Sequence, residues 1–364
     1  MHFQNSFYIE GLIPYPPGKP LEELEREYGI KDSIKLASNE NPLGPSPKAV
    51  AAITAHLASL HRYPDGSGYY LLQRLAEKLH LAPDQIVLGN GSNEIIELLI
   101  RTYLQPGDEV ISPFPSFLMY DLLIRAAGCH DKVVSLKDLR VDLEAMADQI
   151  NSNTRMIFIN NPNNPTGTII SRDDLERFLN RVPPDVIVVV DEAYIEFVQE
   201  RNCALGLDYI GSDKTVVVLR TFSKAYGLAG LRIGYGVMPE EMVSFVNRVR
   251  QPFNTNALAQ VAALAALDDD AFFEKTLRII HSGLKYLYRE LDRLRVGYYP
   301  TQTNFLLIDV DRDAKSVYEE MLRQGVIVRA MTAYGYPTHI RVTVGLPEEN
   351  ERFITSLGKV LYGT

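Results

Sequence analysis

Polar residues with binding or catalytic chemistry follow several apolar runs of this sequence. In GNGSNE, the backbone amides of Gly91, Ser92 and Asn93 stand where a helical pattern begins, and exposed N–H groups at such a position bind anions such as phosphate. The segment lacks the third glycine of a dinucleotide-binding loop and the lysine of a nucleoside-triphosphate loop, so by itself it is equally consistent with a simple turn. The cluster NNPNNPTG supplies Asn164 and, taken alone, is also compatible with a turn.

Ionisable groups follow two further runs. Asp191 ends the aliphatic run that begins VIVVV, and Tyr194 comes three residues later. Ser223 and Lys224 follow VVVLRTF, and Arg232 lies eight residues after the lysine. A single charge at a strand end is more often a helix cap or a surface charge. Together, however, an anion-binding loop, an amide, a carboxylate, an amine and a guanidinium indicate one ligand with a phosphate, a basic ring nitrogen and an aldehyde, which is the chemistry of pyridoxal phosphate.

The elements that must position these groups predict an α/β fold. The runs QIVLGNG, MIFIN, VIVVV and TVVVL are continuous rather than alternating, which is typical of strands buried on both faces by crossover helices. They alternate with helical patterns such as SNEIIELLIRTYL and SRDDLERFLNRV. We therefore expect a large domain with a mainly parallel central sheet flanked by helices, with the ligand beyond the carboxyl ends of the strands.

The pattern changes after about residue 250, where a long helical stretch precedes the short strands NFLLIDV, GVIVRAM and HIRVTVG. We expect a smaller α+β domain there, and a solvated turn between helices at the three aspartates 268–270. The predicted organisation is an N-terminal arm and linker over 1–40, a large cofactor-binding domain over 41–255 and a small C-terminal domain over 256–364.

Composition excludes several classes of protein. The chain has 364 residues, 46% of them hydrophobic, and its formal charge is 37 − 46 = −9, so we expect a globular protein without nucleic-acid or membrane partners. Cys129 and Cys203 form no CxxC pair, and the seven histidines show no ligand-like spacing, so neither a disulfide scaffold nor a metal site is expected. The start MHFQNSFYIEGL lacks the features of a signal peptide, which predicts a cytoplasmic location.

The motifs in combination resemble the fold-type I pyridoxal-phosphate-dependent aminotransferases of class II. The matching segments are KLASNENPLGPSP, GNGSNEIIELL, NPNNPTG, VVDEAY and TFSKAYGLAGLRIGY. Within that superfamily, LIPYPPGKPLEELEREYGI, RYPDG and HIRVTVGLPEENERF are similar to the histidinol-phosphate aminotransferases. The resemblance covers essentially the whole chain and implies transamination between histidinol phosphate and 2-oxoglutarate, giving imidazole-acetol phosphate and glutamate.

The resemblance also implies roles for individual residues. Lys224 would hold the cofactor covalently and transfer protons, and Asp191 would pair with the ring nitrogen. Tyr194 and Asn164 would donate to the 3-oxygen of the ring, and Phe117 would stack on it. The residues that resemble the phosphate cradle are Gly91, Ser92, Asn93, Ser223 and Arg232.

Substrate and partner contacts are implied in the same way. Arg341 matches the arginine that binds the anionic group of the substrate, and Arg329 and Tyr15 resemble further ligands of the histidinol-phosphate phosphoryl group. Arg329 is also compatible with a surface ion pair. Tyr63 resembles a tyrosine that reaches the cofactor phosphate from a second subunit, and Tyr15 also resembles a residue donated across the subunit boundary, so we expect a homodimer with shared active sites.

Three other functions remain open, and two residues have no assigned role. The first two functions, an aromatic amino acid aminotransferase and a threonine-phosphate decarboxylase, would use the same scaffold. The third is a catalytically inactive binding module, which the intact set of cofactor residues argues against. Asn39 and Asn304 lie in motifs near the site without an assigned role. The absence of GxSxG excludes a nucleophile-elbow hydrolase.

Overall fold

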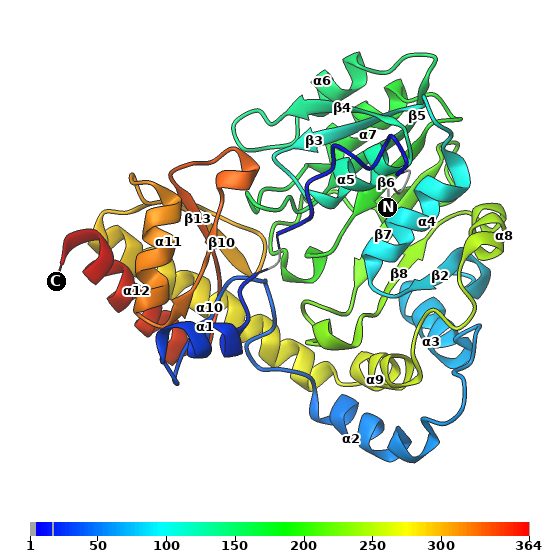
Figure 1. The fold of residues 1–364 in the computed structure, drawn as a ribbon. Coiled ribbons are helices and arrows are strands. Elements are labelled where there is room, and N and C mark those ends of the chain that lie inside the picture. Colours follow the sequence, from blue (N-terminus) through cyan, green and yellow to red (C-terminus); the bar gives the residue numbers. More distant parts are fainter. Residues whose placement is uncertain (1–4, 17, 364) are drawn as a thin grey trace.

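A seven-stranded sheet forms the larger part of the molecule in the computed structural model, which describes residues 5–16 and 18–363 (Figure 1). The strand order is β2–β8–β7–β6–β5–β3–β4, and every strand is parallel to its neighbours except β8, which is antiparallel to both of its own. The strands are β2 (Ile86–Gly89), β3 (Glu109–Phe114), β4 (His130–Ser135), β5 (Thr154–Asn160), β6 (Ile187–Asp191), β7 (Val216–Thr221) and β8 (Gly234–Val237). The predicted mainly parallel sheet is confirmed.

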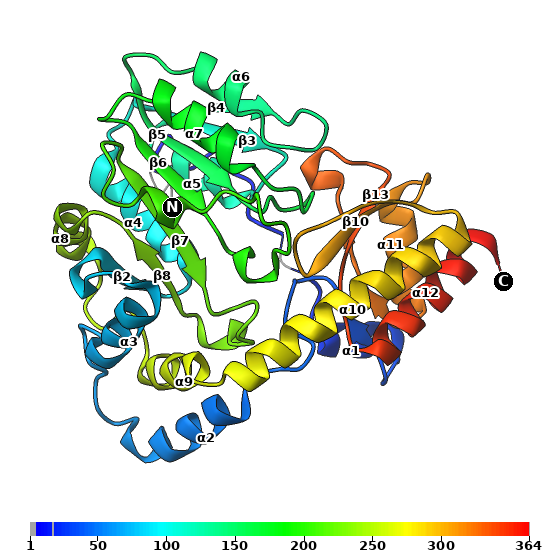
Figure 2. The same cartoon turned by 180° about the vertical axis from the view of Figure 1, so that it is seen from behind.

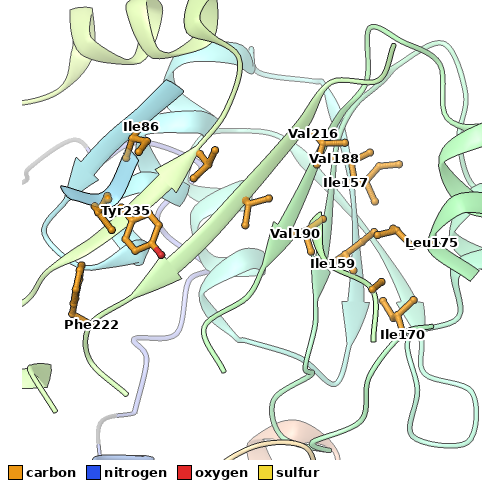
Figure 3. Packing of buried hydrophobic residues seen from close by; sticks show 14 of the residues in the cluster. Ile86, Ile157, Ile159, Ile170, Leu175, Val188, Val190, Val216, Phe222 and Tyr235 are labelled. Atoms are coloured by element: carbon orange, nitrogen blue, oxygen red, sulfur yellow. The ribbon is translucent and has the colours of Figure 1, made fainter. Parts of the chain in front are cut away.

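The central strands are continuous apolar runs because helices cover both faces of the sheet. Val188 and Val190 pack with Ile157 on one face (Figure 3). Val189 packs with Phe158 on the other. The first face is covered by α2 (Pro47–His56), α3 (Tyr69–Leu79), α6 (Leu143–Asp148), α7 (Arg172–Arg181) and α9 (Ala257–Leu267). The second is covered by α4 (Ser92–Tyr103), α5 (Met119–Ala126) and α8 (Glu240–Val249). Successive side chains of a strand point to opposite faces, so every position of β6 is buried, and in β5 and β7 only Arg155 and Arg220 are half-buried.

A smaller antiparallel sheet with order β12–β13–β10–β9 carries the C-terminal part of the chain (Figure 2). Its strands are β9 (Gly297–Tyr299), β10 (Phe305–Asp309), β12 (Arg329–Ala330) and β13 (His339–Thr343). They share a separate hydrophobic core with α10 (Asp270–Leu294), α11 (Ala314–Arg323) and α12 (Pro347–Tyr362). The predicted α+β character of this part is confirmed.

The long helical pattern after residue 255 is two helices, α9 and α10, with a break between them at Asp268 and Asp269. The predicted turn between helices therefore exists, but only part of it is solvated: Asp268 is exposed and Asp269 is buried. The alanine face of α9 packs in the core of the large sheet, whereas α10 continues into the core of the small sheet.

The N-terminal segment packs with both parts of the molecule. Residues 1–4 and 17 of the predicted arm lie outside the described residues. After the arm, α1 (Leu21–Tyr28) ends at Gly29, and β1 (Ile34–Lys35) pairs in parallel with β11 (Val326–Ile327). No helix among the described residues is long and apolar enough to cross a membrane.

Candidate active site

A cavity of about 320 Å³ lies beyond the carboxyl ends of the large sheet, and it also takes residues from the small sheet and from the arm. All the site residues predicted from the sequence except Gly91 and Tyr63 line it: Tyr15, Ser92, Asn93, Phe117, Asn164, Asp191, Tyr194, Ser223, Lys224, Arg232, Arg329 and Arg341. In parallel sheets, ligands bind at this edge because the strand ends and the helix N-termini converge there.

One end of the cavity is an anion cradle at the N-terminus of α4. Gly91 precedes the helix with a φ of 79°, and a Cβ atom placed on it would lie 2.6 Å from Nη2 of Arg232. The guanidinium of Arg232 lies beside Ser223, and its Nη1 donates a hydrogen bond to Ser223 Oγ at 3.4 Å. Gly91 itself is behind the cavity wall, where the absence of a side chain lets the arginine approach the helix start.

The donor set of this cradle fits the phosphate of pyridoxal phosphate. Ser92 and Asn93 supply amides in the first turn of a twelve-residue helix, Ser223 a hydroxyl and Arg232 a positive charge. The buried Oδ1 of Asn93 has no hydrogen-bond partner within the described residues, but as an acceptor it would need a donor and not a phosphate oxygen, so the fit rests on the amides, the hydroxyl and the guanidinium.

Lys224 lines the cavity. Its Nζ donates a hydrogen bond to the backbone oxygen of Ser38 at 3.0 Å and lies 5.8 Å from the centroid of the Tyr194 ring. Burial, together with the positive charges of Arg341 and Arg232 and against the opposing effect of Glu40, lowers the pKa of Lys224 to about 8. An amine with such a pKa is partly unprotonated near neutral pH and can act as a nucleophile or a base.

Asp191 is buried at the end of β6, with 3% of its surface exposed. Its Oδ2 accepts a hydrogen bond from Tyr120 Oη at 2.7 Å, and its Oδ1 accepts one from the backbone N–H of Ala193 at 3.2 Å. Burial raises the pKa of Asp191 to about 6, and these two hydrogen bonds oppose the rise. The carboxylate is therefore ionised at neutral pH and suits a partner that carries a positive charge, such as a protonated ring nitrogen.

Tyr194 is held by two asparagines. Asn39 Nδ2 donates to Tyr194 Oη at 2.9 Å, and Asn164 Nδ2 approaches the same oxygen at 3.5 Å. Burial raises the pKa of Tyr194 to about 12, so its hydroxyl remains a donor. Asn304 in turn donates to the backbone oxygen of Asn39 at 3.0 Å. Both asparagines that lacked an assigned role thus belong to the support of Tyr194.

Arg341 and Arg329 are directly opposite each other on β13 and β12. Arg341 is 5% exposed; its Nη1 donates to Asn164 Oδ1 at 2.6 Å and its Nη2 to the backbone oxygen of Ala37 at 2.7 Å. Its buried Nε has no partner within the described residues. Directly opposed side chains of antiparallel strands share a face, and like charges in that position repel each other unless an anion lies between them.

The two predicted tyrosines lie in different places. Tyr15 reaches the cavity of its own chain, where the Arg329 guanidinium lies 5.5 Å from its ring centroid, and Arg329 Nη2 donates to the backbone oxygen of Pro16 at 2.6 Å. Tyr15 thus lines the cavity of its own chain, and its donation across a subunit boundary stays a prediction. Tyr63 is 83% exposed outside the cavity and stacks on Phe253 at 4.7 Å.

The structure adds site residues that the motifs did not single out. Tyr120 contacts Asp191, Ser38 accepts the hydrogen bond from Lys224, and Asn160 Oδ1 accepts one from the backbone of Asn164. Only Tyr120 carried a usable signal, because it comes three residues after Phe117 at the start of a helical pattern, and residues with that spacing share a helix face. The other two contacts involve backbone atoms whose direction the sequence does not reveal.

The chain belongs to the aminotransferase class I and II family, whose model matches residues 31–357. The resemblance drawn from the motifs is therefore confirmed. The histidinol-phosphate aminotransferase of Desulfotalea psychrophila is 52% identical over 357 residues, which cover 97% of this chain and 94% of the relative. The crystal structure of histidinol-phosphate aminotransferase from Sinorhizobium meliloti in complex with pyridoxal-5'-phosphate has a TM-score of 0.91 at 25% identity and covers 100% of this chain and 99% of that chain.

The same fold also occurs in an enzyme with different chemistry. The crystal structure of L-threonine-O-3-phosphate decarboxylase from Porphyromonas gingivalis has a TM-score of 0.79 at 25% identity, covering 90% of this chain and 99% of that one. The fold alone therefore does not separate a transaminase from a decarboxylase, and the residues of the cavity must do so.

Proposed function

We propose that this protein is a histidinol-phosphate aminotransferase of histidine biosynthesis. It uses pyridoxal phosphate to exchange an amino group between histidinol phosphate and 2-oxoglutarate, which gives imidazole-acetol phosphate and glutamate. The identity of 52% to a relative of that name, over 97% of the chain, supports this activity over an aromatic aminotransferase or a threonine-phosphate decarboxylase.

The observation that carries the proposal is the cross-strand pair Arg329 and Arg341, which lines the cavity. Histidinol phosphate has no carboxylate, so its phosphate dianion must occupy the anionic subsite that glutamate's carboxylate occupies in the other half-reaction. Arg341 can serve a carboxylate, and the second guanidinium of Arg329 balances the additional charge of a dianion. The repulsion between two opposed arginines then becomes an attraction for the substrate.

Several residues that line the cavity would hold the cofactor. The cradle formed by the start of α4, Ser223 and Arg232 would bind its phosphate, Asp191 would contact its ring nitrogen, and Phe117 would stack on its ring. Tyr194 and Asn164 would donate to its 3-oxygen. Pyridoxal phosphate, when bound, supplies an electron-withdrawing ring that stabilises the charge developing at the substrate Cα.

Lys224 provides the reactive amine. Its Nζ lies beside Tyr194, and its lowered pKa makes it a proton acceptor near neutral pH. We assign to it the covalent attachment of the cofactor and the transfer of the proton from the substrate Cα. Burial and the nearby charges of Arg341 and Arg232 favour the unprotonated form of this amine, and the arginines would bind the substrate anion close to it.

A homodimer with shared sites is part of the proposal. Tyr63 is exposed outside its own cavity and stacks on Phe253, which supports a role in the cavity of a second copy. A mixture of the Lys224→Ala and Tyr63→Ala chains, each inactive, should regain activity through hybrid dimers with one intact site. A fully active monomer in analytical ultracentrifugation would contradict this arrangement.

Two further parts of the proposal concern organisation and location. We infer the predicted large cofactor-binding unit and small C-terminal unit, but move their boundary from residue 256 to the break between α9 and α10, because α9 packs in the first core and α10 extends into the second. A cytoplasmic location is supported by the substrate, since a phosphate dianion does not cross a bilayer unaided.

The activity is tested by measuring kcat/KM for histidinol phosphate, phenylalanine and threonine phosphate side by side. We expect histidinol phosphate to give the highest value and threonine phosphate to release no carbon dioxide. A preference for phenylalanine would identify an aromatic aminotransferase, and carbon dioxide release from threonine phosphate would identify a decarboxylase.

A further inference from the structure

Tyr120 is a buried tyrosine whose hydroxyl donates a hydrogen bond to Asp191, a residue that lines the cavity. It lies on α5 with 1% of its surface exposed, and its ring stacks on Phe158 at 4.7 Å with an angle of 10° between the planes. The ring also meets Phe117 edge to face at 5.5 Å. These contacts hold the hydroxyl 2.7 Å from Asp191 Oδ2.

Few groups stabilise the ionised form of the Asp191 carboxyl. Within the described residues no lysine or arginine forms an ion pair with it, and its side-chain oxygens accept hydrogen bonds only from Tyr120 and from the backbone N–H of Ala193. The other ionisable groups around it, Glu192 next in the chain and Tyr194, supply no positive charge. The hydroxyl of Tyr120 is therefore the only side-chain donor to this carboxylate in the described part of the chain.

We propose that Tyr120 is a positioning residue for the reaction: its hydrogen bond orients the Asp191 carboxylate toward the ring nitrogen of the cofactor and stabilises the negative charge there. The inference rests on the role proposed above for Asp191. Burial raises the pKa of Tyr120 well above its ordinary value, so the hydroxyl keeps its proton and donates it to the hydrogen bond at every working pH. Because Tyr120 also touches Phe117, one side chain supports both the face of the cofactor ring and its nitrogen.

The substitution Tyr120→Phe removes the hydroxyl and keeps the ring that packs against Phe158. A hydrogen bond to the ionised form of a carboxyl lowers its pKa, so its loss should raise the pKa of Asp191 by about one unit, a tenfold change in its ionisation constant. Carbon-13 NMR of the apoprotein with labelled aspartate carboxyls measures this titration, and the signal of Asp191 is identified by its disappearance in Asp191→Asn. The measurement requires neither cofactor nor turnover.

The loaded enzyme gives a second measurement. Single-turnover amino transfer from glutamate should slow about tenfold in Tyr120→Phe, while the affinity of the apoprotein for pyridoxal phosphate changes less than twofold, because the phosphate cradle is untouched. Tyr103→Phe is the matched control: Tyr103 is a partly buried tyrosine on α4 that donates to the backbone oxygen of Met242 at 3.1 Å. That variant should leave both the Asp191 titration and the transfer rate unchanged.

The outcomes separate this inference from the proposed function. An unchanged Asp191 titration in Tyr120→Phe, or an equal change in Tyr103→Phe, would overturn the inference while leaving the aminotransferase intact. A wild-type rate in Asp191→Asn would overturn the role of Asp191 and the inference with it. Failure to use histidinol phosphate would overturn the proposed substrate only, since the titration of the apoprotein does not depend on it.

Discussion

The two sides of the active-site cavity are built differently. On the cofactor side, Asp191, Tyr194 and Asn164 are buried and follow neighbouring strands of one sheet. On the substrate side, Tyr15 comes from the arm and Arg329 from a two-residue strand of the small sheet, and both are partly exposed. Arg341 belongs to both sides of the cavity. It lies on the small sheet, but it is buried and donates a hydrogen bond to Asn164 of the cofactor side.

The difference shows how one scaffold can serve several substrates. The side chains of the cofactor side are buried and held by hydrogen bonds from Tyr120, Asn39 and Arg341, which favours chemistry common to the whole family. The substrate side depends on Arg329, whose guanidinium makes its only hydrogen bond in the described chain to the backbone of the arm, so its contribution can change without disturbing the core. We therefore expect substitutions on the cofactor side to affect all substrates, and those at Arg329 to depend on the substrate.

The largest expected effect is that of Lys224→Ala. In the proposed roles of Lys224, the variant would lose both the attachment point of the cofactor and the base for proton transfer, and general acid–base catalysis alone accounts for up to about 10⁴-fold. Turnover with every substrate should therefore fall by about that factor, measured by steady-state kinetics, while Lys214→Ala, a lysine bonded to the backbone of Val182, serves as control. Borohydride reduction and peptide mapping of the wild type should label Lys224, and a label elsewhere would contradict the assignment.

Asp191→Asn should slow amino transfer by roughly 10²-fold for all substrates while cofactor binding persists, because the carboxylate proposed to pair with the ring nitrogen loses its charge. Single-turnover rates measure the loss. A near-wild-type rate would show that the nitrogen of the ring needs no charged partner in this enzyme.

Although Asp191→Asn should slow the reaction, it should make the folded apoprotein more stable. The pKa of Asp191 is raised from 3.8 to about 6 on folding, so the folded state binds more protons and stability falls as pH rises through that window. Asparagine does not titrate, so the Asp191→Asn apoprotein should be more stable than wild type above pH 6, by up to about 3 kcal/mol, with the pH-dependent gain gone below pH 4. Urea unfolding at pH 4 and pH 7 tests this, and a gain that is equal at both pH values would argue against a strained carboxylate.

Arg329→Ala sharpens the comparison between the two sides. Hydrogen bonds to charged groups contribute about 1.5–3 kcal/mol, so kcat/KM for histidinol phosphate should fall roughly tenfold to a hundredfold. Phenylalanine, with one carboxylate and no phosphate, should lose less. Arg341→Ala is the contrasting variant and should harm both substrates, because this buried arginine also supports Asn164. Equal losses for both substrates in Arg329→Ala would remove the distinction between the sides.

The smallest expected effect is that of Gly91→Ala. The added Cβ would lie 2.6 Å from the Arg232 guanidinium at a φ of 79°, so the phosphate cradle must shift. We expect the affinity for pyridoxal phosphate to fall about tenfold, consistent with roughly 1–2 kcal/mol of strain. Gly211→Ala is the control, because Gly211 has a φ of 82° but open space around its Cβ position. A loss of affinity in both variants would point to general backbone strain rather than to the cradle.

Much of the cofactor side could be predicted from the sequence alone. The continuous aliphatic runs of β5, β6 and β7 predict a buried parallel sheet, because only strands covered on both faces can be apolar at every position. The residues that follow them, such as Asp191 and Lys224, then had to meet at one edge. Local order along the chain was sufficient for these inferences.

Only the tertiary structure decided the contacts that join distant segments. Tyr120 and Asp191 are 71 positions apart and Asn39 and Tyr194 are 155 apart, so no local pattern could pair them. The opposition of Arg329 and Arg341 depends on the register of two short strands, and a shift of one residue would turn one guanidinium away from the cavity. Periodicity and turn chemistry specify elements, whereas the packing of whole helices and sheets specifies which side chains meet.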